Sequence, residues 1–126
     1  TYNGDLDELQ CGSSDVLSTI AWYCGNAGDT PHPVGGKDAN AFGLHDVLGN
    51  VSEWCHDWTP EHTGSEPVTD PCQSTPGFSG PWGPVRVTRG GSWSFFASAS
   101  RAAYRGSSDP GGNNDSLGFR PVRTIP

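Results

Sequence analysis

Apolar and polar residues alternate over two stretches of the chain, residues 51–55 and 85–89. This alternation predicts half-buried strands, because successive side chains of a strand point to opposite faces. Elsewhere glycine or proline interrupts the apolar runs, so brief elements are expected. These are a strand within 32–35, one helical turn followed by a strand within 42–51, and a final strand over 117–123.

A short helix is predicted over residues 15–23. Ser14 or Asp15 could cap its first turn, and the glycine and asparagine at 25–26 would end it. One face would carry three apolar side chains at helical spacing, those of Val16, Ile20 and Tyr23. The sequence contains no longer helical pattern and no internal repeat. The fold class is therefore predicted as α+β, with loops dominant.

The composition changes this picture little, but it argues against disorder. The 126 residues include 18 glycines and 11 prolines, and 33% of them are hydrophobic. Five tryptophans argue against a disordered chain, which is poor in large aromatic residues. We expect one domain over residues 1–126, with a core built on tryptophans under long loops. The tryptophans expected there are Trp54, Trp58 and Trp93.

The net charge of -7 bears on the partners that the chain could bind. Nucleic-acid binding usually needs a basic face, so no nucleic-acid partner is expected. An acidic surface would suit cation binding, although solubility is the simpler explanation. No apolar run reaches the length of about 20 residues that spans a membrane, so no membrane span is expected. The chain begins at Thr1 without any methionine, which indicates a processed product or a piece of a longer protein.

Four cysteines, Cys11, Cys24, Cys55 and Cys72, form no Cys-x-x-Cys pair. An even number in a small, loop-rich chain predicts two disulfides and an oxidising compartment. Proximity favours Cys11 with Cys24 and Cys55 with Cys72, which would pin the long loop over 59–84. The other two pairings, and four buried thiols, remain open at this point. With disulfides, the domain is expected to be extracellular or on the cell surface, with the periplasm also possible.

Three phrases, in order, resemble one known family. They are N-A-F-G-L-H-D-V-L-G-N-V-S-E-W over 40–54, R-V-T-R-G-G-S-W over 86–93, and R-A-A-Y-R over 101–105 followed by L-G-F-R over 117–120. Together they are similar to the formylglycine-generating enzyme, or sulfatase-modifying factor, family from about residue 20 to residue 123. The resemblance implies an irregular, loop-rich C-type-lectin-like fold with short antiparallel strands and one or two short helices. Full catalytic members are about twice as long.

The resemblance also shows what is missing for catalysis. The family oxidises a substrate cysteine with copper held by two cysteines that follow the Gly-Gly-Ser-Trp phrase. Here the corresponding residues, Ser94 to Ser100, include no cysteine, and none follows Cys72. Copper(I) needs thiolate or thioether ligands, so neither copper nor this oxidation is expected. The histidines show no spacing that indicates a metal site; they are His32, His45, His56 and His62.

A calcium site is what the resemblance implies for the first phrase. Carried over to this chain, Asp46 and Glu53 would supply side-chain oxygens, and Gly49 and Val51 would supply carbonyls. Calcium prefers several hard oxygen ligands, as this set provides. In the alternative interpretation Asp46 caps a turn and Glu53 pairs with an arginine. Four arginines are expected to pair with acidic residues and tie loops together, namely Arg89, Arg101, Arg105 and Arg120.

Without catalysis, we expect a ligand-binding or surface-display domain that contacts a protein or glycan through residues 94–117. Aromatic anchors and polar groups would form this surface, namely Phe95, Phe96, Ser98, Tyr104, Asn113 and Asn114. Variable proteins of diversity-generating retroelements use the family fold and diversify this region. Their mutable adenine-rich codons cannot yield Lys, Glu, Gln, Met or Trp, and 94–117 contains none of them. The alternatives are a self-associating structural subunit of an extracellular assembly and a fragment of a formylglycine-generating-type oxidoreductase.

Overall fold

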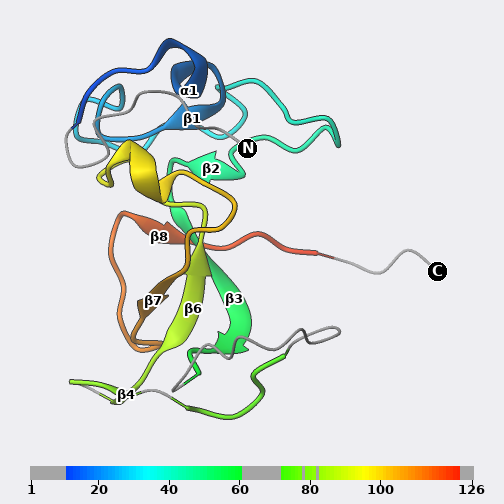
Figure 1. The fold of residues 1–126 in the computed structure, drawn as a ribbon, viewed down its shortest axis with the longest axis vertical. Coiled ribbons are helices and arrows are strands. Elements are labelled where there is room, and N and C mark those ends of the chain that lie inside the picture. Colours follow the sequence, from blue (N-terminus) through cyan, green and yellow to red (C-terminus); the bar gives the residue numbers. More distant parts are fainter. Residues whose placement is uncertain (1–10, 61–71, 78, 82, 123–126) are drawn as a thin grey trace.

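The computed structural model describes residues 11–60, 72–77, 79–81 and 83–122. Its elements lie along one long axis, with the helix and two short strands at one end, a curled four-stranded sheet in the middle and a small ribbon at the other end (Figure 1). In chain order these elements are α1 (Asp15–Ile20), β1 (Ala21–Trp22), β2 (Leu48–Gly49), β3 (Ser52–Trp58), β4 (Ser79–Gly80), β5 (Gly83–Pro84), β6 (Arg86–Arg89), the 3-10 helix η1 (Ala97–Ala99), β7 (Gly106–Ser108) and β8 (Leu117–Gly118).

The central sheet has the order β7-β6-β3-β8 and is mixed. Strands β3 and β6 pair antiparallel, as do β6 and β7, whereas β8 runs parallel to β3. Strands β1 and β2 form a second, parallel pair. The expected strands at 51–55 and 85–89 are therefore confirmed as β3 and β6. The expected antiparallel strands are present, and two parallel pairs accompany them, because β2 and β8 each reach their partner through a long crossover connection.

The pairing of β3 with β6 is interrupted in its middle. Trp54 faces Thr88, but the next paired residue of β3 is Trp58, which faces Arg86. Four steps along β3 (54 to 58) thus correspond to two steps along β6 (88 to 86). Such a bulge re-aims the side chains of the unpaired residues, here those at positions 55–57.

Helix α1 is shorter than predicted, and a different side chain faces the core. Ser14 caps it by accepting a hydrogen bond from the Leu17 amide, as expected. The helix ends at Ile20 because the next residues extend to pair with β2. Leu17 is buried, whereas Val16 is 59% exposed. The predicted helix over 15–23 was therefore right in its start and cap and wrong in its end, and of the three expected apolar side chains Ile20 and Tyr23 reach the core but Val16 does not.

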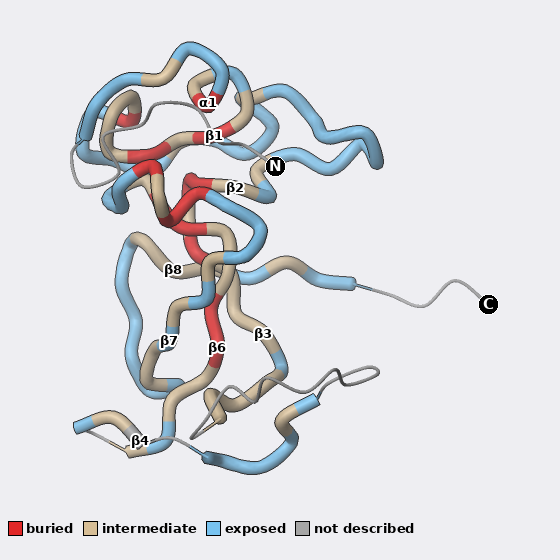
Figure 2. Tube along the Cα trace, viewed as in Figure 1, coloured by how far each residue is buried: buried red, intermediate tan, exposed pale blue. Residues whose placement is uncertain are grey.

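The buried core is small and lies where α1, β1 and η1 meet. It consists of Leu17, Ala21, Tyr23 and Ala97, with Ile20 and Leu48 packed against it. Figure 2 shows buried segments in this end of the molecule and along β6. The tryptophans at 54, 58 and 93 are half-buried, so the expected tryptophan core is wrong for the described residues. The Tyr23 hydroxyl instead accepts from the Ser14 amide at 2.7 Å and thereby ties the helix cap to the core.

Two predicted elements are replaced by loops that side chains hold in place. None of residues 32–35 lies in a strand, and residues 34–35 form a turn. Next to this turn the His32 ring stacks on Trp22, with 3.7 Å between ring centroids. The helical turn predicted within 42–51 is also absent from these described residues. There the Asn40 side chain accepts hydrogen bonds from the Phe42 and Leu44 amides, an alternative to helical pairing.

A disulfide joins Cys11 to Cys24, which confirms the first expected pairing. Cys55 and Cys72 are free thiols, so the second expected pairing is wrong in this structure. The Cys72 thiol hydrogen-bonds to the carboxylate of Asp57 rather than meeting Cys55. Residues 61–71 of the expected long loop, with His62, lie outside the described residues. None of the helices in the described residues has the length and hydrophobicity that a membrane span requires.

Candidate functional site

Close contacts and buried side chains hold the backbone of the expected contact surface in place over residues 91–100. Gly91 has a φ of 74° and passes so close to η1 that a side chain there would lie 2.8 Å from the Ala99 carbonyl oxygen. Ser92 and Ser100 are buried, as are the alanines of η1 at 97 and 99. The Cys24 amide donates to the Phe95 carbonyl at 3.1 Å. The main chain is therefore fixed, while the Phe95 and Phe96 side chains between these anchors are exposed.

Two exposed phenylalanines and one half-buried tyrosine are the aromatic side chains of this segment. Phe95 is 38% and Phe96 is 44% exposed. Tyr104 meets Phe95 edge to face, with ring centroids 6.3 Å apart and planes at 72°, a favourable geometry for two aromatic rings. Arg89 donates to the Tyr104 carbonyl at 2.8 Å and holds this partner in place. Arg89 thus holds a loop in place, as expected, but its partner is a backbone carbonyl and not the expected acidic side chain.

Two adjoining hollows share Phe95 and Tyr104. The first, of 210 Å³, is completed by Ser94, Phe96, Ser98 and Ala99. The second, of 250 Å³, includes Asn114 and lies over β7. Five of the six expected ligand-binding residues are therefore brought together; Asn113 is exposed and lines neither hollow. The second hollow also includes serines that the sequence analysis did not single out: Ser107, Ser108 and Ser116 lie within the predicted surface over 94–117, whereas Ser52 lies outside it.

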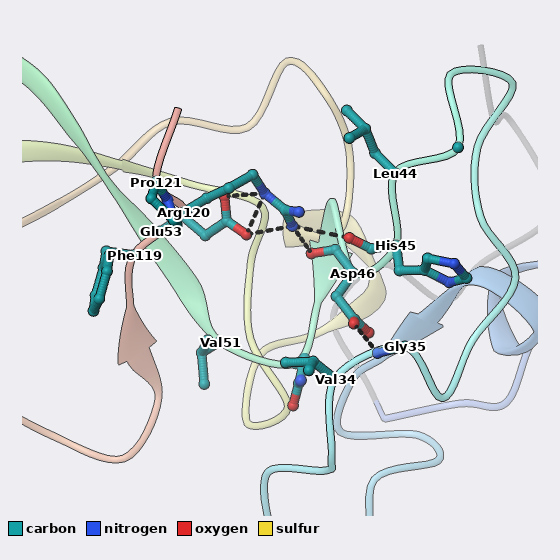
Figure 3. A pocket seen from close by; sticks show the side chains of 12 residues that line it. Val34, Gly35, Leu44, His45, Asp46, Val51, Glu53, Phe119, Arg120 and Pro121 are labelled. Atoms are coloured by element: carbon teal, nitrogen blue, oxygen red, sulfur yellow. Dashed lines mark hydrogen bonds and ion pairs between the residues drawn. The ribbon is translucent and has the colours of Figure 1, made fainter. Parts of the chain in front are cut away.

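A larger hollow of 470 Å³ lies on another part of the molecule, around Asp46, Glu53 and Arg120 (Figure 3). Arg120 forms an ion pair with Glu53, with 2.6 Å between Nη2 and Oε1. Its Nε lies 3.0 Å from both carboxylate oxygens. The hydrogen bond to Glu53 raises the pKa of the Arg120 guanidinium above its usual value.

Arg120 also holds the loop before β2. Its Nη2 donates to the carbonyl oxygens of His45, at 2.9 Å, and Asp46, at 3.1 Å. The Asp46 carboxylate accepts from the Gly35 amide through Oδ2, whereas its buried Oδ1 has no hydrogen-bond partner in the structure. This arrangement agrees with the alternative interpretation, in which Asp46 holds a turn and Glu53 pairs with an arginine.

The sequence model of the sulfatase-modifying factor enzyme 1-like domain matches residues 11–125. The chain belongs to this family. Formylglycine-generating enzyme from Streptomyces coelicolor is 38% identical over 92 residues, which cover 70% of this chain and 27% of the enzyme. Treponema denticola variable protein 1 shares the fold, with a TM-score of 0.64 and 37% identity over 85% of this chain and 37% of that one.

Other relatives of this sulfatase-modifying-factor-type domain carry different names. Serine/threonine-protein kinase pkn1 of Chlamydia caviae is 39% identical over 128 residues, which cover 94% of this chain and 20% of the kinase. Chaperone protein LppX of Paenibacillus barcinonensis is 30% identical over 127 residues, which cover 83% of this chain and 38% of the chaperone. The chain therefore spans between a fifth and two fifths of the length of these four proteins.

The metals that family resemblance implies do not fit the residues as arranged. Ser94 to Ser100 offer no thiolate for copper. For calcium, Asp46, Val51 and Glu53 line the same hollow, whereas Gly49 is not among the lining residues. Arg120 occupies both oxygens of Glu53 and places a positive charge beside the expected ligands. Calcium would have to displace this arginine in order to bind, so the arrangement argues against the expected calcium site, which stays a hypothesis for experiment.

Proposed function

We propose that this family domain is a non-catalytic binding module that contacts a protein ligand through the surface over residues 94–117. The observation that carries the proposal is the Phe95–Tyr104 pair, which is shared by two adjoining hollows. Aromatic side chains that border a concave surface are the usual anchors of protein interfaces.

Rigidity of the underlying backbone supports a binding role. Buried Ser92 and Ser100 bracket the exposed phenylalanines. Hydrogen bonds from the Phe95 amide to Ser92, at 3.0 Å, and from the Ala99 amide to Phe96, at 2.9 Å, fix the turn between them. A surface held in one conformation loses little entropy on binding, so its contacts yield more affinity. The segment also combines tyrosine with serine, glycine and asparagine, residue types that antibody loops favour.

The relatives support a scaffold used for more than one purpose. One matching structure is named a variable protein, and the matching sequences are named a kinase, a chaperone and an enzyme. A domain shared by proteins of such different names is better explained as a scaffold than by one reaction. The residue types present in 94–117 are all compatible with adenine-directed codon diversification. Variation of a fixed-backbone surface would give different ligands to different copies.

The test measures binding of the domain to a panel of purified cell-surface proteins and glycans. For a protein ligand, Phe95→Ala and Tyr104→Ala should each weaken affinity by at least about tenfold. Phe119→Ser is the matched control, because Phe119 is 78% exposed and lies outside both hollows. Binding that ignores the first two variants would refute the proposed surface, and binding to glycans alone would refute a protein ligand. Formylglycine formation in a Cys-x-Pro-x-Arg peptide with added copper would refute the non-catalytic role.

A second candidate function is a structural subunit of an extracellular assembly. Exposed apolar side chains favour it, since such side chains mark interfaces; they include Val34, Phe42, Leu44, Phe119 and Val122. Size-exclusion chromatography at rising concentration tests it, and a strict monomer would count against it. For both candidates we propose an extracellular, cell-surface or periplasmic location, because the disulfide between Cys11 and Cys24 is typical of oxidising compartments.

A further inference from the structure

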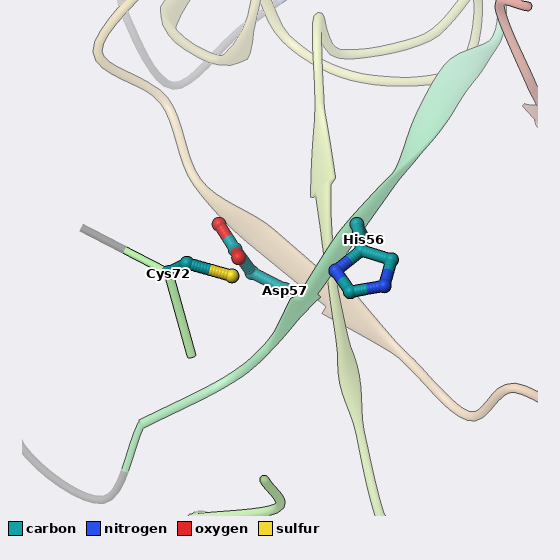
Figure 4. A group of neighbouring side chains, drawn as sticks. All are labelled: His56, Asp57 and Cys72. Carbon is teal, nitrogen blue, oxygen red and sulfur yellow. The ribbon is translucent and has the colours of Figure 1, made fainter. Parts of the chain in front are cut away.

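The geometry points to a zinc site formed by His56, Asp57 and Cys72, at the bulge of β3 (Figure 4). Each residue offers one ligand atom, a ring nitrogen, a carboxylate oxygen and a sulfur, and these atoms lie within 4.8 Å of one another. None of the three lines the hollows over residues 94–117. The inference is therefore independent of the proposed binding function.

The bulge explains how two consecutive strand residues can serve one ion. In a regular strand the side chains of His56 and Asp57 would point to opposite faces. Here both lie in the stretch where pairing with β6 is interrupted, between Trp54 and Trp58. Arg86 donates to the His56 carbonyl and stacks on Trp58, with 4.1 Å from Cζ to the ring centroid, so the irregular strand is held from the β6 side.

Cys72 reaches this bulge because the residue after it is bonded to β3. The Trp58 amide donates to the Gln73 carbonyl at 2.9 Å. The Gln73 amide in turn donates to Asp57 Oδ1 at 3.3 Å. These two bonds place the sulfur beside the carboxylate and orient the carboxylate itself. Hydrogen bonds that orient a metal ligand in this way are a general feature of protein metal sites.

The mixture of ligand atoms selects zinc. Zinc accepts cysteine sulfur, histidine nitrogen and carboxylate oxygen in one tetrahedral site. Calcium and magnesium prefer oxygen alone, and copper(I) prefers sulfur ligands. Three protein ligands leave the fourth position to water or to a donor from a bound partner. The exposed His56 and Cys72 side chains make this position accessible.

Metal binding also accounts for a thiol that is otherwise hard to explain. The chain contains a disulfide, yet Cys72 is free and exposed. Exposed free thiols are readily oxidised in the compartments where disulfides persist. Coordination to zinc would protect the Cys72 sulfur from oxidation. It would also fasten the segment that begins at Cys72 to β3.

The experiment uses the whole chain with its disulfide intact, stripped of metal by a chelator. Titration of free thiols comes first and should find both Cys55 and Cys72 reactive. Zinc is then titrated in competition with a chromophoric chelator, and cobalt(II) is added to a separate sample. We expect stoichiometric zinc binding and a thiolate-to-cobalt charge-transfer absorption band. A Cys55–Cys72 disulfide, or failure of zinc to compete with the chelator, would overturn the inference.

Three variants separate this site from other thiol chemistry. Cys72→Ser and His56→Ala should each weaken zinc binding by at least about tenfold, and Cys72→Ser should abolish the cobalt charge-transfer band. Both residues are exposed, so the near-ultraviolet circular dichroism of the tryptophans should not change. Cys55→Ser is the matched control and should bind zinc like the wild type. Unchanged affinity in Cys72→Ser, or lost affinity in Cys55→Ser, would show that the assignment is wrong.

Discussion

Arg120 and Glu53 are 67 residues apart in the sequence, yet their side chains meet in a salt bridge of 2.6 Å. The same guanidinium donates to the carbonyls of His45 and Asp46, so one side chain joins β3, the segment after β8 and the loop before β2. Regular secondary structure provides few backbone bonds between these segments. The ion pair therefore substitutes for them at the point where the chain returns to the sheet.

Arg120→Lys is expected to lower the free energy of unfolding by about 1–2 kcal/mol. Lysine keeps the charge but cannot donate in several fixed directions at once, so the bonds to Glu53 and to the carbonyls cannot all persist. Urea denaturation measures the effect. Arg101→Lys is the control, since Arg101 is exposed, and it should stay within about 0.5 kcal/mol of the wild type. Equal stability of the two variants would contradict the role of Arg120.

Calcium is expected to leave the melting temperature unchanged while Arg120 holds both oxygens of Glu53. An ion at this place would have to displace a guanidinium that is bonded to four acceptors on three residues. Thermal unfolding with calcium and with a chelator measures this directly. A calcium-dependent rise that disappears in Asp46→Ala would show that the family-based calcium prediction is right and that the arginine moves.

Gly49→Ala is expected to destabilise the domain by more than about 3 kcal/mol. Gly49 has a φ of 73°, and a methyl group there would collide with the Trp22 carbonyl on the neighbouring strand. Gly12→Ala is a matched control, because a side chain at Gly12 would meet no atom within 4 Å. Thermal unfolding of the two variants should therefore differ widely. A mild effect at Gly49 would mean that β1 and β2 do not approach as closely as the structure has them.

Much of the fold could be predicted because it depends on local pattern and on family motifs. The alternation of apolar and polar residues was enough to predict β3 and β6, and Ser14 was recognisable as a helix cap. The end of α1 could not be predicted, because pairing of β1 with the distant β2 overrides the helical preference of residues 21–23. Strand β7 was missed for a similar reason. Its Gly-Ser-Ser sequence has little strand propensity and is extended through its pairing with β6.

The candidate sites were predictable to different degrees. The aromatic anchors followed from the sequence, because Phe95, Phe96 and Tyr104 stand out in a segment of small residues. The serines of the second hollow come from three separate segments, so no local signal could have assembled them. His56, Asp57 and Cys72 were missed as a group, since two consecutive residues and one 15 positions later match no usual metal spacing. A bulge, which sequence rarely indicates, brings them together.

Cys24→Ser is expected to lower the free energy of unfolding by about 2–4 kcal/mol, because the disulfide closes a loop with a sequence separation of 13 residues. The loop contains α1 and most of the small core, so loss of the disulfide should destabilise that end of the molecule most. Denaturation with and without reductant measures the effect. Cys72→Ser, assayed without metal, should match the wild type. If reductant leaves wild-type stability unchanged, the bond is not the main constraint on this loop.

We propose that this family domain binds its ligand through the anchored aromatic surface around Phe95 and Tyr104. The most direct measurement selects peptides from a random displayed library against the domain and maps the bound peptide on the isotope-labelled domain by NMR. The account predicts that the largest chemical-shift changes centre on Phe95, Phe96 and Tyr104. Changes centred on the Glu53–Arg120 hollow, with these three residues unaffected, would contradict it.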